Sequence, residues 1–176
     1  MASDSSERGG QIKSDISAIK PRLRNAPPLY VWPMPAPTPF DARLVRLRKQ
    51  RALKSQAEAT FLHKRAADDL AERLEVIPRR FERVLTLGGG GLMRAALEAR
   101  PDLRARLGKI VEADVVGAGV AVDPEHLPFA EGSFELILSP LLLHWTNDLP
   151  GALIQIRRAL KPDGLLLASL FGGQTL

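Results

Sequence analysis

The stretch RVLTLGGGGLMRAAL, at residues 83–97, decides the fold of this chain. Val84, Leu85 and Leu87 form a short apolar run, glycines fill positions 88–91, and apolar residues then recur at helical spacing from Leu92. This order predicts a strand, a glycine turn and a helix. In an open α/β sheet a ligand lies beyond the carboxyl end of such a strand, because the glycines let it approach the backbone and the helix offers free N–H groups. The alternative is a tight turn that binds no ligand.

Length, composition and charge narrow the class of protein. The chain has 176 residues and is 45% hydrophobic, which fits one domain of moderate size and a tail. It has no cysteine, which excludes disulfides, thiolate zinc sites and cysteine nucleophiles and fits a reducing cytosol. The net charge of +5 comes from basic residues interleaved with acids, a pattern more typical of solvated helix faces than of nucleic-acid binding. No apolar run reaches membrane-spanning length. We therefore expect a cytoplasmic protein with no membrane span, no metal site and no nucleic-acid partner.

The chain divides into a tail and a domain. Residues 1–39 are expected to form a disordered tail, because prolines crowd its second half and forbid regular helix. An apolar piece of this tail around Trp32 could instead dock on the domain, which is expected to span residues 40–176.

Two helices are expected to open the domain. The first is a basic helix at residues 40–52, which Asp41 could cap. The second runs from about residue 57 to 77, with an apolar stripe through Leu62 and Ala66. His63 lies beside this stripe, and we interpret it as a surface histidine.

Apolar runs between turn residues predict four further strands, at residues 109–114, 120–123, 134–139 and 165–171. A helix capped by Asn147 or Asp148 precedes the last strand and ends at Pro162. Strands that alternate with helices indicate right-handed crossovers and a mostly parallel α/β sheet.

Three classes of ligand compete for the glycine turn. A phosphate-binding P-loop is excluded, because Gly-Lys-Ser/Thr does not follow the glycines. The dinucleotide fingerprint fits poorly, because Met93 stands where its last glycine belongs. S-adenosylmethionine is the third class, since its carboxylate can lie on the N–H groups of the turn. Asp114, after the second strand, is placed to accept from both ribose hydroxyls, and Asp123, after the third, from the adenine amino group. The alternative is that both acids merely cap strand ends.

Several segments together resemble the class I, type 11 S-adenosylmethionine-dependent methyltransferases. They are VLTLGGG at 84–90, EAD at 112–114, VDPEHLPF at 122–129, GSFELILS at 132–139 and LKPDG at 160–164. More narrowly, LHWTNDLP at 143–150, FGGQTL at 171–176 and the start of the basic helix, FDARL at 40–44, resemble the family of mitochondrial complex I assembly factor 5 and its bacterial relatives. That family is related to the methyltransferase that acts on malonyl-acyl carrier protein.

The resemblance implies a Rossmann-like parallel sheet in the order 3-2-1-4-5 with S-adenosylmethionine as cofactor. The cofactor-binding residues that it implies are Gly88, Gly89, Gly90, Asp114, Asp123, Pro124 and Ser139. His144, just past the fourth strand, could orient or deprotonate the acceptor as a catalytic residue, or could be a structural histidine paired with backbone. No catalytic triad is expected, because the sulfonium is already activated and positioning supplies much of the rate.

The chain departs from the family pattern in four places. Thr86 stands where the family usually has an acid, and Leu92 where it often has glycine. Residues Val115–Gly119 replace a crossover helix, although a crossover between parallel strands normally needs about a dozen residues. The sequence also ends after the fifth strand, so we expect a domain that lacks the C-terminal strand pair and can self-associate through that exposed apolar strand.

Three functions follow as hypotheses. The first is an S-adenosylmethionine-dependent methyltransferase with a small-molecule or protein acceptor. The second, implied by the narrower resemblance, is a protein-modifying, arginine hydroxylase-like or assembly factor for respiratory complex I. The third is a non-catalytic binding module or an inactive fragment.

Overall fold

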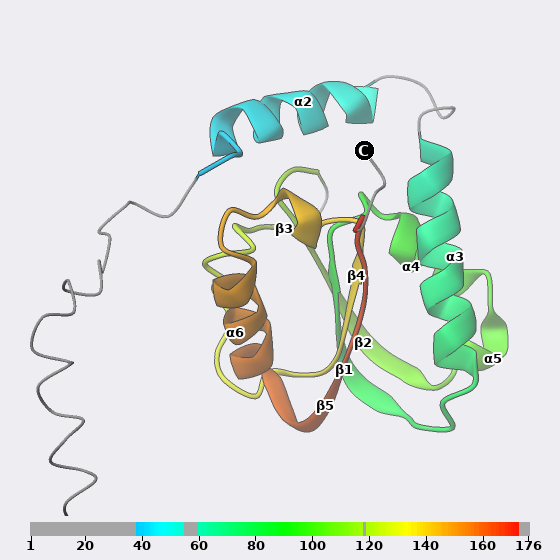
Figure 1. The fold of residues 1–176 in the computed structure, drawn as a ribbon. Helices are drawn as coiled ribbons and strands as arrows, with labels where there is room; N and C mark the ends of the chain where they lie inside the picture. The colour runs from blue at the N-terminus through cyan, green and yellow to red at the C-terminus, as the bar shows by residue number, and fades with distance from the viewer. Residues whose placement is uncertain (1–37, 55–59, 118, 173–176) are drawn as a thin grey trace, which may run out of the picture. The chain divides into compact units, whose positions relative to one another are not determined.

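A parallel sheet organises the residues that the computed structural model describes, which are 38–54, 60–117 and 119–172 (Figure 1). Its five strands lie in the order β3-β2-β1-β4-β5, and every neighbouring pair is parallel. The predicted α/β class, strand order and direction are therefore confirmed. The strands are β1 (Phe81–Leu87), β2 (Leu107–Asp114), β3 (Val120–Ala121), β4 (Phe134–Pro140) and β5 (Leu160–Ser169). Apart from residues 38 and 39, the predicted tail lies outside the described residues.

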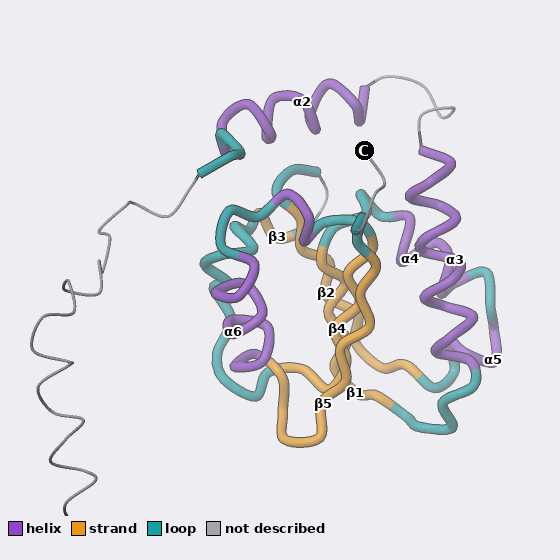
Figure 2. The backbone as a smooth tube through the Cα atoms, viewed as in Figure 1, coloured by secondary structure: helices purple, strands orange, loops and turns teal. Residues whose placement is uncertain are grey.

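Helices cover both faces of the sheet (Figures 1 and 2). On one face lie α3 (Phe61–Glu75), α4 (Leu92–Glu98) and α5 (Pro101–Arg104), and on the other lies α6 (Leu149–Ala159). Val84 of β1 packs toward α3 and α4, whereas Leu85 and Leu87 pack toward α6. Successive strand residues point to opposite faces, so each strand supplies apolar side chains to both layers of the core.

The connections at α6 differ from the predicted boundaries. Asp148 caps α6, because its carboxylate accepts from the Gly151 N–H at 2.8 Å. Asp148 is one of the two caps predicted for this helix. The helix ends at Ala159, and Leu160 is already extended and paired with Phe134 of β4. Pro162 disfavours helical backbone at Lys161 and cannot donate to the helix, and the pairing of Leu160 with Phe134 moves the end one residue earlier. The last strand thus begins five residues earlier than predicted and ends at Ser169.

The short link from β2 to β3 contains no helix in its described residues, as its length required. The short link suffices because β3 pairs only with the last residues of β2, Ala113 with Val120 and Asp114 with Ala121. The chain therefore does not have to run back along the length of β2 before β3 begins. Gly119 makes this short link possible. Its φ is 93°, and a Cβ there would lie 2.3 Å from the Glu112 carbonyl oxygen, so no other residue fits.

The basic helix α2 (Ala42–Lys54) begins as predicted at an Asp41 cap. The Asp41 carboxylate accepts from the N–H groups of Arg43 at 2.8 Å and Leu44 at 3.1 Å. None of the 13 residues of α2 is buried, in contrast to α3, which buries Leu70 and Leu74. Among the described helices, none is both long and apolar enough to cross a bilayer.

Candidate cofactor site

The glycine turn at Gly88–Gly91 lies where β1 ends. All of these glycines have positive φ, from 57° to 89°, which L side chains rarely adopt. A Cβ at Gly88 would lie 2.8 Å from Leu142 Cβ, and one at Gly89 would lie 2.8 Å from Pro140 Cγ. The turn therefore fits closely against the end of β4 only because it has no side chains there.

Asp114 ends β2 beside this turn and is 4% exposed. Its Oδ2 accepts from the Gly90 N–H at 3.1 Å, and its Oδ1 accepts from the Val115 N–H at 2.6 Å. The Oδ1 atom also pairs with the ammonium of Lys49, which comes from α2. Parallel strands end at one edge of the sheet, so the fold brings together the glycine turn and the acid, as their positions in the sequence predicted. No pattern in the sequence pointed to Lys49 as a partner of Asp114.

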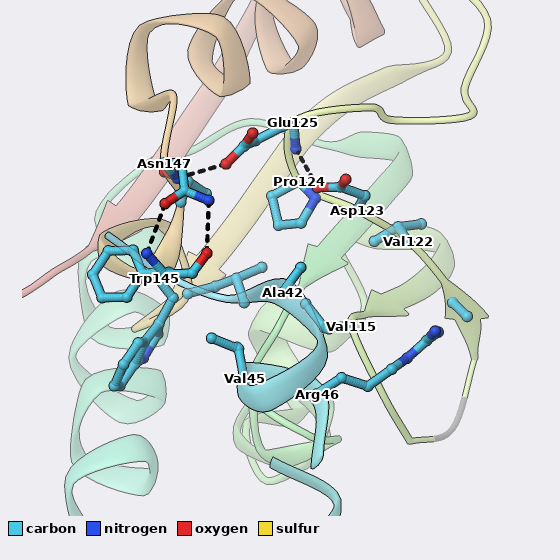
Figure 3. Close-up of a pocket in the computed structure, with 14 residues that line it drawn as sticks. Ala42, Val45, Arg46, Val115, Val122, Asp123, Pro124, Glu125, Trp145 and Asn147 are labelled. Atoms are coloured by element: carbon cyan, nitrogen blue, oxygen red, sulfur yellow. Dashed lines mark hydrogen bonds between the residues drawn. The ribbon is translucent and has the colours of Figure 1, made fainter. Parts of the chain in front are cut away.

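Asp123 and Pro124 lie on a pocket of about 310 Å³ (Figure 3). Its walls come from the start of α2, the end of β2, the segment after β3 and the segment after β4, and include Val45, Val115, Val122 and Asn147. The Asp123 carboxylate accepts from the Glu125 N–H at 2.9 Å and lies 3.2 Å from His126 Nδ1. Asp123 is thus placed at the pocket, with its carboxylate turned to its own loop.

Asn147 closes the pocket from the side of β4. Its amide group accepts from the Phe40 N–H at 2.8 Å and donates to the Phe40 carbonyl at 3.0 Å (Figure 3). The Phe40 ring also packs edge-on against Trp145, with 5.4 Å between centroids. The Trp145 ring thus packs against Phe40. Asn147 ties the entry of α2 to the segment after β4, a role that capping signals could not reveal.

His144 lies in the 3-10 turn η2 (Leu143–Trp145), just past β4. Its Nδ1 is buried and has no hydrogen-bond partner among the described residues, so the predicted alternative of a backbone-paired histidine finds no support at that atom. Its ring packs against Phe171, with 4.7 Å between centroids. Burial lowers its pKa from the ordinary 6.5, and the charges of His63 and Lys49 lower it further, so the neutral imidazole is favoured.

His63 is the residue whose predicted place is wrong. It is half-buried, not on the surface, and its pKa is lowered by burial and by Lys49 against an opposing effect of Asp114. The buried face of α3 runs through Ala67, Leu70 and Leu74. His63 lies four residues before Ala67 and therefore on this face. An apolar stripe placed through His63 and Ala67, instead of Leu62 and Ala66, would have predicted its partial burial.

Two further features concern the fit of a cofactor. Ser139 at the end of β4 is fully buried, and its Oγ has no partner among the described residues. Thr86 is buried on β1, in register with Glu112 of β2, whose carboxylate pairs with Arg94 at 2.9 Å. The side-chain-free turn, the buried acid beside it and the free Ser139 hydroxyl fit a ligand with an anionic end and vicinal hydroxyls. In the part of the chain that is described, no group of His, Asp and Glu residues could hold a metal ion.

Comparison with known proteins agrees with this geometry. The family described as "Methyltransferase domain", of type 11, matches residues 89–168. The trans-methyltransferase CalH, crystallised in complex with SAH, has a TM-score of 0.51 and 20% identity, and the alignment covers 73% of this chain and 44% of CalH. The chain carries a class I S-adenosylmethionine-dependent methyltransferase domain, and the family implies S-adenosylmethionine as cofactor.

Curated relatives of two kinds are similar to this chain. Arginine-hydroxylase NDUFAF5, mitochondrial, of Homo sapiens is 38% identical in an alignment 154 residues long that covers 78% of this chain and 43% of that protein. The malonyl-acyl-carrier-protein O-methyltransferase of Halorhodospira halophila is 33% identical in an alignment 150 residues long that covers 78% of this chain and 51% of that protein. The chain thus spans about half the length of the curated relatives that it matches.

Proposed function

We propose that this chain binds S-adenosylmethionine at the edge of the sheet where β1 and β2 end and supports methyl transfer to a small-molecule or protein acceptor. The observation that carries the proposal is the buried carboxylate of Asp114, hydrogen-bonded to Gly90 within the glycine turn. Its ion-pair partner, Lys49, comes from α2 and not from the sheet, and a buried carboxylate with two acceptor oxygens is suited to hold two hydroxyl groups.

The remaining contacts of the cofactor are proposed from the family resemblance. The turn at Gly88, Gly89 and Gly90 lies against its carboxylate end, and Asp114 holds the ribose hydroxyls. Within the turn, the Gly88 N–H already donates to the Ala113 carbonyl and the Gly90 N–H to Asp114. Asp123 and Pro124 take the adenine in the pocket, and Ser139 supplies a buried hydroxyl at the end of β4. The bound cofactor supplies an activated methyl group, so the protein has to position the acceptor and exclude water.

His144 is the proposed catalytic residue on the acceptor side. Its Nδ1 has no partner among the described residues, and its lowered pKa favours the neutral imidazole near pH 7. This atom is buried, so it takes a proton from an acceptor nucleophile only after the ring turns it toward the site. The nearby charge of Lys49 disfavours the protonated imidazole. His144 thus serves to orient an acceptor or to remove its proton.

A second function is proposed because the human arginine-hydroxylase NDUFAF5 is 38% identical to the chain. The chain would then modify a protein arginine, or assist assembly of respiratory complex I, instead of methylating a small molecule. A third, a non-catalytic binding module, draws on Thr86, which offers no carboxylate where the family usually has one. The cysteine-free sequence suits the cytoplasm as the proposed compartment.

One assay separates these functions. The chain is incubated with methyl-labelled S-adenosylmethionine and either malonyl-acyl carrier protein or an arginine-containing protein substrate. We expect label in the acceptor, and a gain of one methyl group by mass spectrometry. In parallel reactions supplied with O2 and a reductant, a gain of one oxygen atom without label would support the hydroxylase. Cofactor binding without any product in either reaction would support the binding module.

A further inference from the structure

Helix α2 spans the hollow above the end of β2. Ala42, Val45 and Arg46 line the pocket of Figure 3, and Arg46, Gln50 and Leu53 line a second hollow beside it. These residues recur at helical spacing, so one face of α2 looks onto the sheet edge. The opposite wall of both hollows includes Val115 and Ala121. The helix therefore covers the proposed cofactor site without being packed into the core, since it buries none of its residues.

Two polar attachments hold α2 in this place. At its start, Phe40 is hydrogen-bonded through its backbone to Asn147 and packs against Trp145. Further along, the ammonium of Lys49 pairs with Asp114, and the Lys49 side chain is 23% exposed. At about 1.5 Å per residue, Ala42 and Lys49 are separated by roughly 10 Å along the helix. Opening one attachment would therefore free one end of the helix while the other still holds.

The second attachment uses the carboxylate to which the ribose hydroxyls are assigned. A carboxylate oxygen offers about two lone-pair sites. Asp114 Oδ1 already accepts from the Val115 N–H and from Lys49, whereas Oδ2 accepts from the Gly90 N–H alone. Two vicinal hydroxyls need one site on each oxygen. Of the Oδ1 donors, the backbone N–H is fixed by the fold, so Lys49 is the one that can leave.

We propose that α2 is a strap over the cofactor site and that Lys49 is its latch, which competes with the hydroxyl groups of the cofactor for Asp114. Binding of the cofactor then releases Lys49 and loosens this end of α2, while Asn147 keeps the other end attached. The inference rests on the proposed function for the identity of the competing ligand. The latch itself rests on the contacts of Lys49 with Asp114.

The test compares Lys49→Met with Arg48→Met in the full chain. Both variants remove one positive charge from the same helix, but Arg48 is exposed and does not line either hollow. S-adenosylhomocysteine is the probe, with affinity measured by calorimetric titration. Because an ion pair of this partly exposed kind contributes modestly, Lys49→Met is expected to bind the probe about three- to tenfold more tightly, and Arg48→Met to bind as the parent does. Unchanged or weaker binding by Lys49→Met would overturn the competition.

Hydrogen exchange separates failure of the latch from failure of the proposed function. Without any ligand, the amides of residues 42–54 should exchange faster in Lys49→Met than in the parent or in Arg48→Met, and circular dichroism should show that all three are folded. Equal exchange in Lys49→Met and the parent would overturn the latch even if the parent binds the probe. A parent chain that does not bind S-adenosylhomocysteine would overturn the proposed function and with it the competition, whatever the exchange of α2.

Discussion

Two half-buried histidines, His63 and His144, make the site sensitive to acid. Burial lowers the pKa of each below the ordinary 6.5, and Lys49 lowers both further. A histidine with a lowered pKa in the folded state is neutral there while the unfolded chain still takes up a proton. The stability that it contributes is fully present above the unfolded value and is lost as the pH falls through the folded value.

We therefore predict that the free energy of unfolding falls as the pH drops from about 7 to about 5. The measurement is urea denaturation at a series of pH values, on the parent chain and on the double variant His63→Gln, His144→Gln. The double variant should show a shallower slope, because its glutamines do not titrate. Equal slopes would mean that other groups cause the loss.

Single residues also show what the sequence could and could not predict. The place of Asp114 beside the glycine turn was predictable, because Asp114 ends β2, the turn directly follows β1, and both strands end at the same edge. The contact of Lys49 with Asp114 was not, because the two residues lie 65 positions apart and α2 carries many similar basic residues. The partial burial of His63 could have been predicted, since it required only that the apolar stripe of α3 be placed one residue further along the chain.

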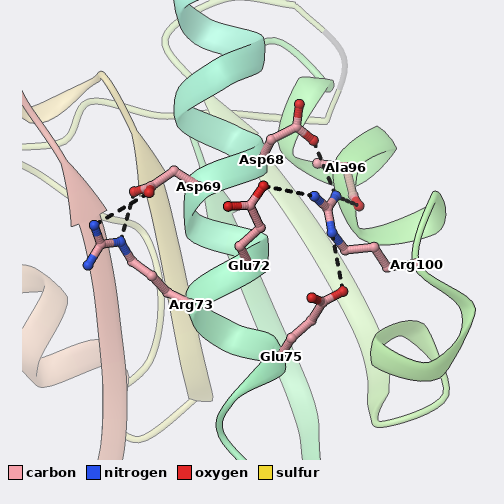
Figure 4. A network of polar contacts seen from close by, with 7 residues as sticks. All are labelled: Asp68, Asp69, Glu72, Arg73, Glu75, Ala96 and Arg100. Carbon is pink, nitrogen blue, oxygen red and sulfur yellow. Dashed lines mark hydrogen bonds and ion pairs between the residues drawn. The ribbon is translucent and has the colours of Figure 1, made fainter.

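At the scale of elements, Arg100 clamps α3 to the end of α4 (Figure 4). Its guanidinium donates to the Ala96 carbonyl at 2.8 Å and lies 3.2 Å from Asp68, 3.3 Å from Glu75 and 3.8 Å from Glu72. The three acids all come from α3, and the Arg100 side chain is 20% exposed. A network that is partly shielded from water and joins two elements stabilises more than one isolated surface pair.

Replacing Arg100 by Met should lower the free energy of unfolding by about 1–2 kcal/mol, because the carboxylates on α3 lose their shared partner. The matched control is Arg73→Met. Arg73 pairs with Asp69 within α3 alone, and its side chain is 66% exposed, so its loss should have a smaller effect (Figure 4). Urea midpoints measure both, and equal losses in the two variants would show that Arg100 does not act as a clamp.

Element types were easier to predict than element ends. The strands and the two longer helices that pack on the sheet, α3 and α6, follow from apolar periodicity, which gives a strong signal over such lengths. The one-turn helix α5 and the start of β5 at Leu160 were missed, because each depends on a few residues next to a proline. The pairing of Leu160 with Phe134 is a tertiary contact that outweighs the helical spacing of Leu160 with Ile156.

At the scale of the whole molecule, β5 forms one edge of the sheet. It pairs with β4, and Leu165, Leu166 and Leu167 are only partly buried. Leu170 and Phe171, which follow the strand, are large apolar residues with exposed fractions of 45% and 46%. An apolar edge strand with free backbone groups can pair with a strand of another chain.

We predict that the 176-residue chain self-associates through this edge. Size-exclusion chromatography with light scattering should give a mass above that of one chain. Ala168→Lys places a charge on an exposed position of β5 and should shift the protein toward monomer, whereas Ala105→Lys, at an exposed position after α5, should not. A monomeric parent at high concentration would contradict the prediction.

The central claim is that Asp114 and the glycine turn form a site for S-adenosylmethionine. The most direct measurement is calorimetric titration of the chain with S-adenosylhomocysteine, repeated with the variants Asp114→Asn and Asp163→Asn. Asp163 is an exposed acid in the first half of β5 and serves as the control. We predict saturable one-to-one binding in the micromolar range. It should weaken at least tenfold, or by about 1.4 kcal/mol, in Asp114→Asn, because the charged acceptor is lost, and should stay unchanged in Asp163→Asn. Absence of saturable binding, or equal affinity of a folded Asp114→Asn protein, would contradict the claim.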